Sequence, residues 1–503
     1  MKSKIKIVLL LTAALCIVSC SKDFLNTEPT GYLSSDAMSK IAKNDPASVL
    51  DPLVSGLYST TFLLNSGGST TRNDMDYGQK NIDLCTDIMC GDVAGAAFTY
   101  GWYRAIAQYT DQIKTGTMPY IAWRLYYRLI KSANEILDIL GDDENIPEDA
   151  ALRVYYGQAK AMRAYCYFNL INLYQHPYSD KKDSPGVPIY RTQLETEVHG
   201  QSTVGAVYDL IVKDLEDAIV ALQDFDRGSD KSKINQDVAY GMLANAYLFM
   251  GEYEKAAAAA DAVISKGKYP ILSQADALTN GFNSVSKSSN WMWGIDVTPE
   301  NYSGIACWWS HVDIFTYGYA SSGDYKLIDA GLYAAIPSAD VRKKWFGKYT
   351  SGNIEVGVDP LLPIGKFFDP GKTPDGDRTW TNDLVYMRVE EMYLIKAEAL
   401  ANANDIAGAR VALKALLDQR NPSADLSVMN QADLLNEIYL NWRVEMWGEG
   451  KSYFAMKRFK KSMTRASNNA LLAGNTFPYN YNRMIFEIPE REQLNNPNLV
   501  PQN

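Results

Sequence analysis

The chain has 503 residues, of which 47% are hydrophobic and 21% charged, and this ordinary globular composition excludes a disordered or collagen-like protein. Lys and Arg number 49 against 59 Asp and Glu, so the net charge is −10. An acidic chain of this kind argues against non-specific binding to nucleic acid, because phosphates attract a basic surface. The 33 Tyr and 10 Trp residues suit a wet recognition surface, since each ring combines an apolar face with a polar edge.

The N-terminus has the pattern of an export signal. Basic Lys2, Lys4 and Lys6 precede an apolar run at residues 7–18, which is too short to span a bilayer comfortably and fits a signal-peptide core. The run ends at Ser19-Cys20, which resembles the lipobox of bacterial lipoproteins. We therefore predict a signal peptide at residues 1–19, a lipid anchor on Cys20 and a linker to residue 50; ordinary secretory cleavage is the alternative.

Two stretches repeat the same helical-hairpin pattern. Residues 237–266 place Tyr and Ala residues at helical spacing on both sides of Gly251, and residues 393–422 repeat this order at a constant offset. The order resembles a tetratricopeptide unit, which must stack on its neighbours to bury its apolar face. Further helices are predicted at residues 121–140, 155–174, 204–222 and 434–447.

The predicted organisation is a single mainly α domain, residues 51–503. Its tetratricopeptide-like helical-hairpin scaffold comprises residues 120–268 and 384–450. Two excursions, residues 51–118 and 270–383, are rich in Gly, Ser, Asp, Pro and aromatic residues, with a few short strands such as residues 291–295. Long loops on a rigid scaffold are usually functional, so we expect recognition on the excursions and partner docking on the helices.

Several segments, taken in order, resemble the SusD/RagB family of Bacteroidetes outer-membrane lipoproteins. They begin at Asp23-Phe24-Leu25 after Cys20 and end at Asn496-Pro497-Asn498-Leu499, and between these lie Trp123 to Asn134, Gly157 to Leu170 with Gly186-Val187-Pro188, Arg388 to Glu398, and Glu445 to Tyr453. His176-Pro177 departs from the family at a local turn, where many members have Gly.

The resemblance implies a non-enzymatic glycan-binding lipoprotein. Such a protein is anchored by lipid in the outer membrane, faces the cell surface, and delivers oligosaccharides to a SusC-like TonB-dependent transporter. It implies no cofactor, no metal and no catalytic residue. It leaves open which glycan is bound and which transporter is the partner.

A pyranose ring needs a flat aromatic side chain for its apolar face and polar side chains for its hydroxyls. Two clusters offer both, one around residues 72–77 and 100–103 and one at residues 301–319. Of the adjacent tryptophans in the second cluster, we expect one buried and one exposed. The candidate glycan-binding residues are Arg72, Asn73, Asp74, Tyr77, Trp102, Trp308, Trp309 and Tyr317.

The remaining tryptophans divide by pattern. Alternation in a strand-like run predicts that Trp291 and Trp293 belong to the core, and apolar helical faces predict the same for Trp123, Trp442 and Trp447. Trp345 and Trp380 fit either a core or a surface position.

Two other functions remain open. A glycoside hydrolase would need two carboxylates flanking a sugar, for which Asp74, Asp76, Asp313 and Asp324 are formally available. A peptide- or protein-binding module would use the helical repeats and leave the aromatic excursions without a role. A Cys85–Cys90 disulfide also remains possible, whereas the acidic stretch at residues 369–377 is interpreted as a turn in preference to a Ca²⁺ site.

Overall fold

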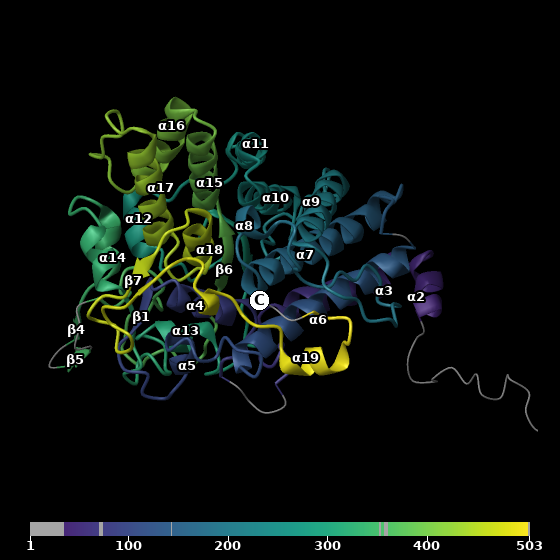
Figure 1. The fold of residues 1–503 in the computed structure, drawn as a ribbon, viewed down its shortest axis with the longest axis horizontal. Helices are drawn as coiled ribbons and strands as arrows, with labels where there is room; N and C mark the ends of the chain where they lie inside the picture. The colour runs from purple at the N-terminus through teal and green to yellow at the C-terminus, as the bar shows by residue number, and fades with distance from the viewer. Residues whose placement is uncertain (1–34, 70–73, 142, 352–353, 357–360, 501–503) are drawn as a thin grey trace, which may run out of the picture.

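A computed structural model describes residues 35–69, 74–141, 143–351, 354–356 and 361–500. In Figure 1 the long helices occupy the upper and right-hand parts of the view, and the loop-rich segments with most of the short strands lie at the lower left. The predicted signal peptide and Cys20 lie outside the described residues.

The first half of the helical scaffold forms as predicted. Side-chain and glycine caps set its limits: Asp149 and Thr203 accept hydrogen bonds from backbone amides in the first turns of α7 and α9, and Gly141 and Gly251 end α6 and α10 at positive φ. Each helix packs on the next along the chain. The helices are α6 (Thr117–Leu140), α7 (Ala150–Tyr174), α9 (Val204–Ala221), α10 (Gln236–Met250) and α11 (Tyr253–Ile264).

The second half continues the same stack after the long excursion. The hairpin of α15 (Val389–Asn402) and α16 (Ile406–Leu417) packs through α15 on α11, and α17 (Gln431–Glu445) packs on α15. Fully buried alanines at the crossings, Ala256, Ala260 and Ala397, allow this close approach. The two predicted repeat copies are therefore direct neighbours, although more than one hundred residues separate them in sequence.

A two-stranded sheet closes the base of the second excursion. Strand β2 (Trp291–Ile295) pairs antiparallel with β6 (Leu384–Arg388), so that Trp291 faces Arg388. All five residues of β2 are buried, which confirms that Trp291 and Trp293 belong to the core. The excursion also contains α12 (Gln274–Thr279), α13 (Trp308–Val312), β3 (Lys326–Ile328), α14 (Ala330–Ala335), the 3-10 helix η2 (Val341–Trp345), β4 (Tyr349–Ser351) and β5 (Ile354–Val356), of which β4 and β5 pair antiparallel.

The first excursion is more regular than predicted. It contains α3 (Pro46–Thr60), α4 (Gln79–Met89), β1 (Val93–Gly95) and the short α5 (Arg104–Ala107). Helix α4 is buried along its whole length, although it includes Lys80, Asp83 and Asp87. Strand β1 pairs with β3, which joins the two excursions into one layer.

The C-terminal segment returns to the first scaffold helices. After α18 (Lys451–Arg458), the Phe486 amide donates to the Leu173 carbonyl and the Glu487 amide donates to the Gln112 carbonyl. Helix α19 (Glu490–Asn495) then lies beside α6, as Figure 1 shows. The remaining elements are α2 (Ser35–Ala42), α8 (Tyr178–Lys181), β7 (Met463–Thr464), β8 (Thr476–Phe477) and the 3-10 helix η3 (Asn482–Met484).

Candidate functional site

Six aromatic side chains from both excursions gather where loops reach the solvent. Tyr100 and Tyr302 are 50% and 44% exposed, and the other four are half-buried. We refer to the six as the aromatic surface: Tyr100, Trp102, Tyr302, Tyr317, Tyr319 and Trp380.

The rings of the aromatic surface form two linked groups. Tyr319 makes edge contacts with Tyr100 and Trp102, at 5.4 and 6.0 Å between ring centroids. Trp380 lies nearly parallel to Tyr302, at 6.3 Å and 4°, and contacts Tyr317 edge-on. Since residues 317 and 319 are close neighbours in the chain, the two groups flank a single backbone segment.

The backbone holds Trp380 in an uncommon conformation. Its φ of 53° lies in the left-handed region, which bulky residues rarely adopt. Its indole nitrogen donates to the Tyr317 carbonyl at 2.9 Å, and its amide donates to the Asp377 carboxylate at 3.3 Å. Tyr103, next to Trp102, also has positive φ. Such conformations persist where surrounding contacts fix them and often occur at binding sites, and these hydrogen bonds hold the Trp380 ring in place.

A stacked column supports the aromatic surface from below. The His311 ring lies between Tyr77 and Tyr319, at 5.6 and 4.7 Å between centroids, and its Nε2 contacts the Asp74 carbonyl at 2.8 Å. Burial lowers the pKa of His311 to about 3, so its ring is neutral at physiological pH. The predicted residues Asp74 and Tyr77 are thus buried supports, because Asp74 is 7% and Tyr77 2% exposed.

Trp308 and Trp309 do not present a face to a ligand. Both are at most 2% exposed and pack edge-to-face on each other and on Phe367. The expectation that one of them is exposed is wrong, because they begin helix α13 and that helix lies inside the fold with all five residues buried. Their prediction as glycan contacts is corrected accordingly.

Trp102 and Tyr317 are the predicted residues that lie on the aromatic surface. The predicted Arg72 and Asn73 lie outside the described residues. Trp380, which the sequence left undecided, is a central member of the surface. Its neighbours Asp375 and Asp377 belong to a turn-rich segment. Turn-rich segments usually lie at the surface, so a tryptophan in this segment was the sequence signal for an exposed ring.

The carboxylates near the aromatic surface are held by hydrogen bonds within the protein. Asp313 accepts from the Phe315 amide, the Thr316 hydroxyl and the Asp369 amide, and burial raises its pKa to about 7. Asp76 accepts from the amides of Gly67 and Ser69. These carboxylates stabilise loop conformation and do not form an exposed pair.

The loop acids at residues 369–377 cap local turns. Asp369 accepts from the Gly371 amide, and Asp377 accepts from the Thr379 amide and hydroxyl. Within the described part of the chain, no group of three His, Cys, Asp or Glu side chains is arranged to hold a metal ion. Cys85, Cys90, Cys166 and Cys307 are free thiols, so the possible Cys85–Cys90 disulfide is not formed.

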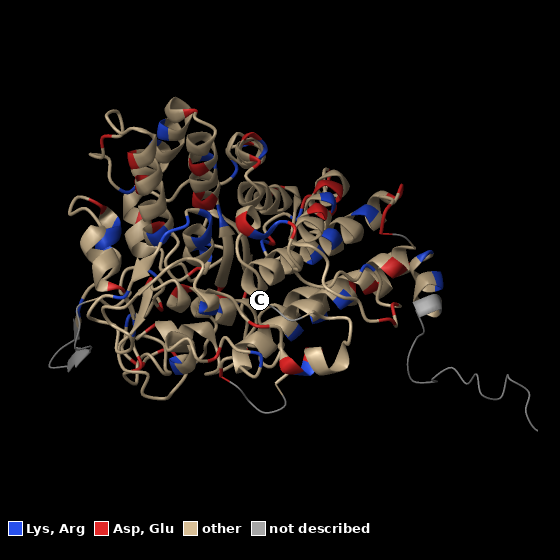
Figure 2. Ribbon diagram, viewed as in Figure 1, with Lys and Arg blue, Asp and Glu red and all other residues tan. Residues whose placement is uncertain are grey.

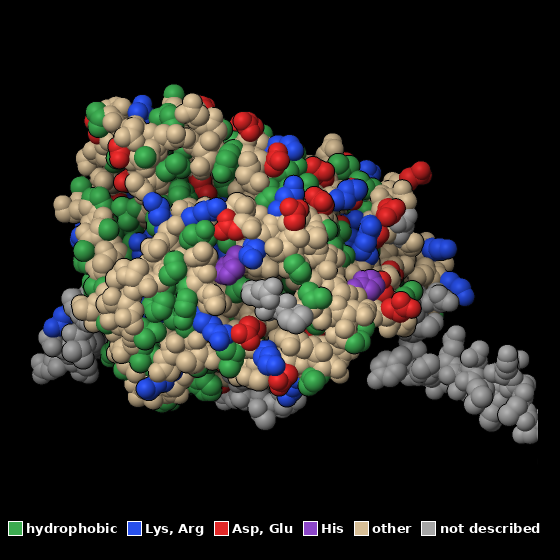
Figure 3. All heavy atoms as spheres, in the orientation of Figure 1, with side chains coloured by type: hydrophobic (Ala, Val, Ile, Leu, Met, Phe, Trp, Pro, Cys, Tyr) green, Lys and Arg blue, Asp and Glu red, His purple; other side chains and the backbone are tan. Residues whose placement is uncertain are grey.

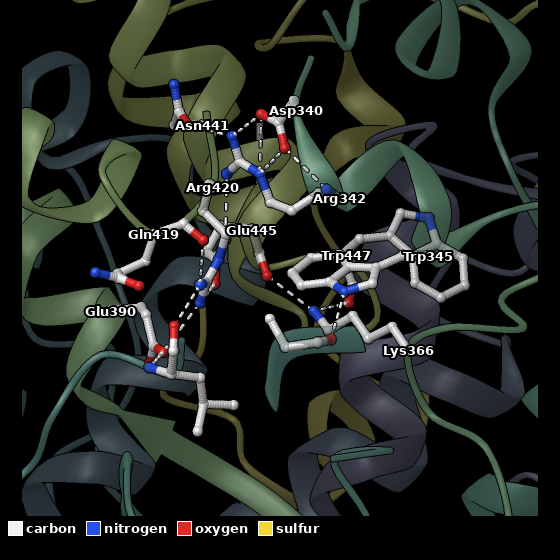
Figure 4. Close-up of polar contacts among 12 residues, drawn as sticks. Asp340, Arg342, Trp345, Lys366, Glu390, Gln419, Arg420, Asn441, Glu445 and Trp447 are labelled. Atoms are coloured by element: carbon white, nitrogen blue, oxygen red, sulfur yellow. Dashed lines mark hydrogen bonds and ion pairs between the residues drawn. The ribbon is translucent and has the colours of Figure 1, made fainter. Parts of the chain in front are cut away.

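A second polar cluster lies deep in the scaffold, where β6, α15 and α17 meet the second excursion (Figure 4). At its centre, the Glu445 carboxylate receives hydrogen bonds from three guanidinium groups, those of Arg342, Arg388 and Arg420. Every charged member is at most 4% exposed. We call this cluster the buried charge network; it pairs four cations, Arg342, Lys366, Arg388 and Arg420, with four anions, Asp340, Glu390, Glu445 and Glu449.

The buried charge network is structural. Lys366 donates to the Glu445 and Trp447 carbonyls and to Glu449, which attaches the excursion to the end of α17. The nearby guanidinium groups hold the pKa of Glu445 well below its usual range. A carboxylate that stays ionised and has three arginine partners has no proton or lone pair to offer a substrate.

Comparison with known proteins identifies the family. A model described as "Starch-binding associating with outer membrane" matches residues 63–248, and a model described as "SusD family" matches residues 343–503, together more than two thirds of the chain. The chain belongs to the SusD/RagB family. The resemblance of the sequence segments is thereby confirmed, and the mainly α fold agrees with it. In the described parts of this SusD-family chain, no helix is both long and apolar enough to span a bilayer.

Individual SusD-type relatives match over nearly full length. "SusD-like protein P2" of Formosa agariphila is 23% identical over 99% of this chain and 98% of its own. A crystal structure of a SusD-like carbohydrate binding protein from Bacteroides vulgatus has a TM-score of 0.77 at 24% identity, covering 91% of this chain and 98% of its own. Surface glycan-binding protein A from Bacteroides thetaiotaomicron, in complex with laminarihexaose, has a TM-score of 0.66 at 16% identity, covering 90% and 98%.

Proposed function

We propose that this protein captures an oligosaccharide at the aromatic surface and does not hydrolyse it. The observation that carries this proposal is the set of six solvent-reaching rings that contact one another, with Trp380 held by its hydrogen bond to the Tyr317 carbonyl. Flat rings at a concave or stepped surface suit the apolar faces of sugars, and nearby polar groups suit their hydroxyls. Arg378, whose guanidinium lies 4.1 Å from the Tyr317 ring centroid, and Asp375 supply such groups.

The absence of hydrolysis is part of the proposal. Hydrolysis by the usual route needs two carboxyl groups on either side of the scissile bond. Asp313 is 1% exposed and has three hydrogen-bond donors, and Asp324 is buried beside Lys326. These occupied carboxylates support binding without turnover.

We further propose that the protein works at the outer-membrane surface, attached through a lipid on Cys20. From there it would deliver glycan to a SusC-like TonB-dependent transporter, with the helical scaffold docked on the transporter. Family membership and the lipobox-like sequence before Cys20 support this part. Pull-down of a TonB-dependent transporter with the wild-type chain, lost when Cys20→Ala releases the protein from the membrane fraction, tests the location and the partner together.

A polysaccharide panel tests the central proposal. The mature chain without its lipid-bearing Cys20, residues 21–503, is run by affinity gel electrophoresis against each glycan, and reducing-sugar release is measured in the same samples. We expect retardation by one glycan class without sugar release, and loss of that retardation in a Tyr302→Ala/Trp380→Ala variant. Sugar release by the wild type, or unchanged retardation of the variant, would contradict the proposal.

A further inference from the structure

A cavity of about 600 Å³ opens between α6 and α19, and none of its lining residues is among the predicted glycan-binding residues. It lies where the C-terminal helix returns to the first long helix (Figure 1). Tyr120, Arg124, Tyr127, Arg128 and Lys131 line one side from a single face of α6, and Arg491 and Glu492 line the other from α19. We call this the cationic cavity.

The cationic cavity has an excess of positive charge. Four cations and one carboxylate line it, although the whole chain has a net charge of −10. Among the residues that the structure describes, none of the four cations is ion-paired with an acid. On the face seen in Figure 3, which includes α19, basic and acidic side chains are interspersed. The basic residues of α6 and α19 are blue in Figure 2.

Two of the cations converge on one neutral group. The Tyr120 hydroxyl accepts hydrogen bonds from Arg124 at 2.8 Å and from Arg491 at 3.2 Å. Both guanidinium groups also lie near the Tyr120 ring, at 5.5 and 4.9 Å from its centroid. Like charges held this close repel each other, and neither guanidinium is ion-paired with an acid of the described chain. An anionic ligand would offset it.

The carboxylate in the cavity does not neutralise the arginines. Glu492 hydrogen-bonds with Trp123 and Asn496, and burial raises its pKa. The pKa of a carboxyl in contact with arginines is lowered instead, as at Glu445. Glu492 therefore belongs to the cavity wall, and the guanidinium groups remain available.

Aromatic rings line the cavity beside the cations. Trp123 contacts Tyr127 at 4.7 Å between centroids, and Tyr127 contacts Tyr190 edge-on at 6.0 Å. The Tyr127 hydroxyl donates to the Pro188 carbonyl, which fixes its ring while leaving the side chain half-buried. Rings for the face of a sugar and planar guanidinium groups for an oxyanion are thus present in one cavity.

Hydrogen bonds and ring contacts link the cationic cavity to the support of the aromatic surface. Arg128 donates to the Ser66 carbonyl at 3.4 Å, and the Asn65 amide donates to the Asp76 carbonyl. Close to Asp76 in the chain, the Asp74 carbonyl and the Tyr77 ring contact His311, which stacks on Tyr319. These contacts link the two sites through residues 65–66 and 74–77.

We propose that the cationic cavity binds an acidic sugar unit, one with a carboxylate or a sulfate ester, of the captured glycan. This inference rests on the proposed glycan-binding function and specifies its ligand as an anionic oligosaccharide. Arginine forks bind carboxylate and sulfate oxygens in pairs, and the aromatic wall takes the ring that carries them.

Matched pairs of probes test the charge requirement. Oligogalacturonate is compared with its methyl ester, and sulfated carrageenan oligosaccharides with their desulfated form, by titration calorimetry of the mature chain at about 50 mM salt. We expect at least one acidic member to bind about tenfold or more tightly than its uncharged partner. Equal affinity within both pairs, or no binding of any acidic member, would overturn the inference.

Charge-removing variants locate the effect. Arg124→Gln/Arg491→Gln should lose the preference for the acidic member, whereas Lys255→Gln/Lys344→Gln, which removes two exposed cations elsewhere, should keep it. Circular dichroism and thermal unfolding check that both variants fold. Equal loss in the control would overturn the inference, because it would indicate attraction by overall charge.

Other sources of an anion are separated in the same assay. Inorganic sulfate or phosphate that binds as tightly as the acidic oligosaccharide would overturn the inference in favour of a small-anion site. Binding to vesicles containing anionic phospholipid, lost in the Arg124→Gln/Arg491→Gln variant, would overturn it in favour of a membrane contact. Retention of an uncharged glycan that depends on Trp380, with no charge preference, would refute this inference and leave the proposed function intact. No retention of any glycan would refute both.

Discussion

The buried charge network and the cationic cavity are built from the same kinds of charged side chain, but the charges are paired in the network and unpaired in the cavity. In the network, four cations face four carboxylates, and all eight side chains are removed from solvent. In the cavity, four cations face one carboxylate that is hydrogen-bonded elsewhere. Neutralised charges in the core hold one arrangement of the chain, whereas unneutralised charges at the surface are available to a ligand.

The largest effect expected from this comparison is on folding. Glu445→Gln removes the charge of the carboxylate that Arg342, Arg388 and Arg420 share, so that the four buried cations of the network face three anions in place of four. Removing one partner of a buried pair costs about 3–5 kcal/mol, and we expect the free energy of unfolding in urea to fall by that amount.

The matched control for Glu445→Gln is Glu252→Gln. Glu252 forms an ion pair with Lys255 at 3.3 Å, and both side chains are exposed. We expect the free energy of unfolding of this control to change by less than about 1 kcal/mol. If the two variants lose similar stability, the network is not the structural element described here.

Acid should weaken the network by a related amount. Arg388 and Lys366 lower the pKa of Glu449 from its usual 4.5 to about 2. A carboxyl with a lowered pKa in the folded state contributes stability above its ordinary pKa and loses that contribution as pH falls towards the lowered value. We expect the free energy of unfolding to fall by up to about 3 kcal/mol between pH 4.5 and pH 2. Glu449→Gln should flatten this part of the pH profile, and an unchanged slope would contradict the assignment.

Trp308 and Trp380 sharpen the distinction between core and ligand surface. Trp308→Ala should cost about 3–5 kcal/mol of stability, because a fully buried ring leaves a cavity. Trp380→Ala should change stability much less and weaken glycan binding by about 1–1.5 kcal/mol, the usual value of an aromatic contact. Thermal unfolding and calorimetry on both variants measure the two effects. A large loss of stability in Trp380→Ala, with a loss of glycan binding in a stably folded Trp308→Ala, would contradict these assignments.

The smallest expected effect is that of salt. Raising the ionic strength from about 0.05 to 0.5 M shortens the screening length severalfold and should weaken binding of an acidic oligosaccharide at the exposed cavity. The buried charge network is not reached by ions, so the midpoint of urea unfolding should move little. Salt-independent binding of the acidic ligand would contradict a role for the cavity arginines.

The sequence predicted the scaffold well, because helical periodicity and caps are local signals. The predicted helices at residues 121–140 and 204–222 correspond to α6 and α9 within a few residues. The sequence did not predict that α4 is buried. Charged residues such as Lys80 and Asp83 usually lie at the surface, but here they are buried and form an ion pair at 3.0 Å. Burial of charge depends on partners that folding brings together.

The ligand surfaces were predicted only in part. Trp102 and Tyr317 were selected from their clusters, but Trp308 and Trp309 have the same composition signal and are core residues. Exposure of an aromatic residue in an irregular segment depends on the tertiary path of the loop, which periodicity does not encode. For the cationic cavity, the stripe of Tyr120, Arg124, Tyr127, Arg128 and Lys131 on one helical face was a readable signal, but its partner Arg491 lies far along the chain.

The most direct test of the account is calorimetric titration of the glycan retained by the wild-type protein into the wild type and into Trp380→Ala. We expect a loss of affinity of about tenfold with an unfolding temperature close to that of the wild type. Unchanged affinity of the Trp380→Ala variant would contradict the central claim that the aromatic surface binds the glycan.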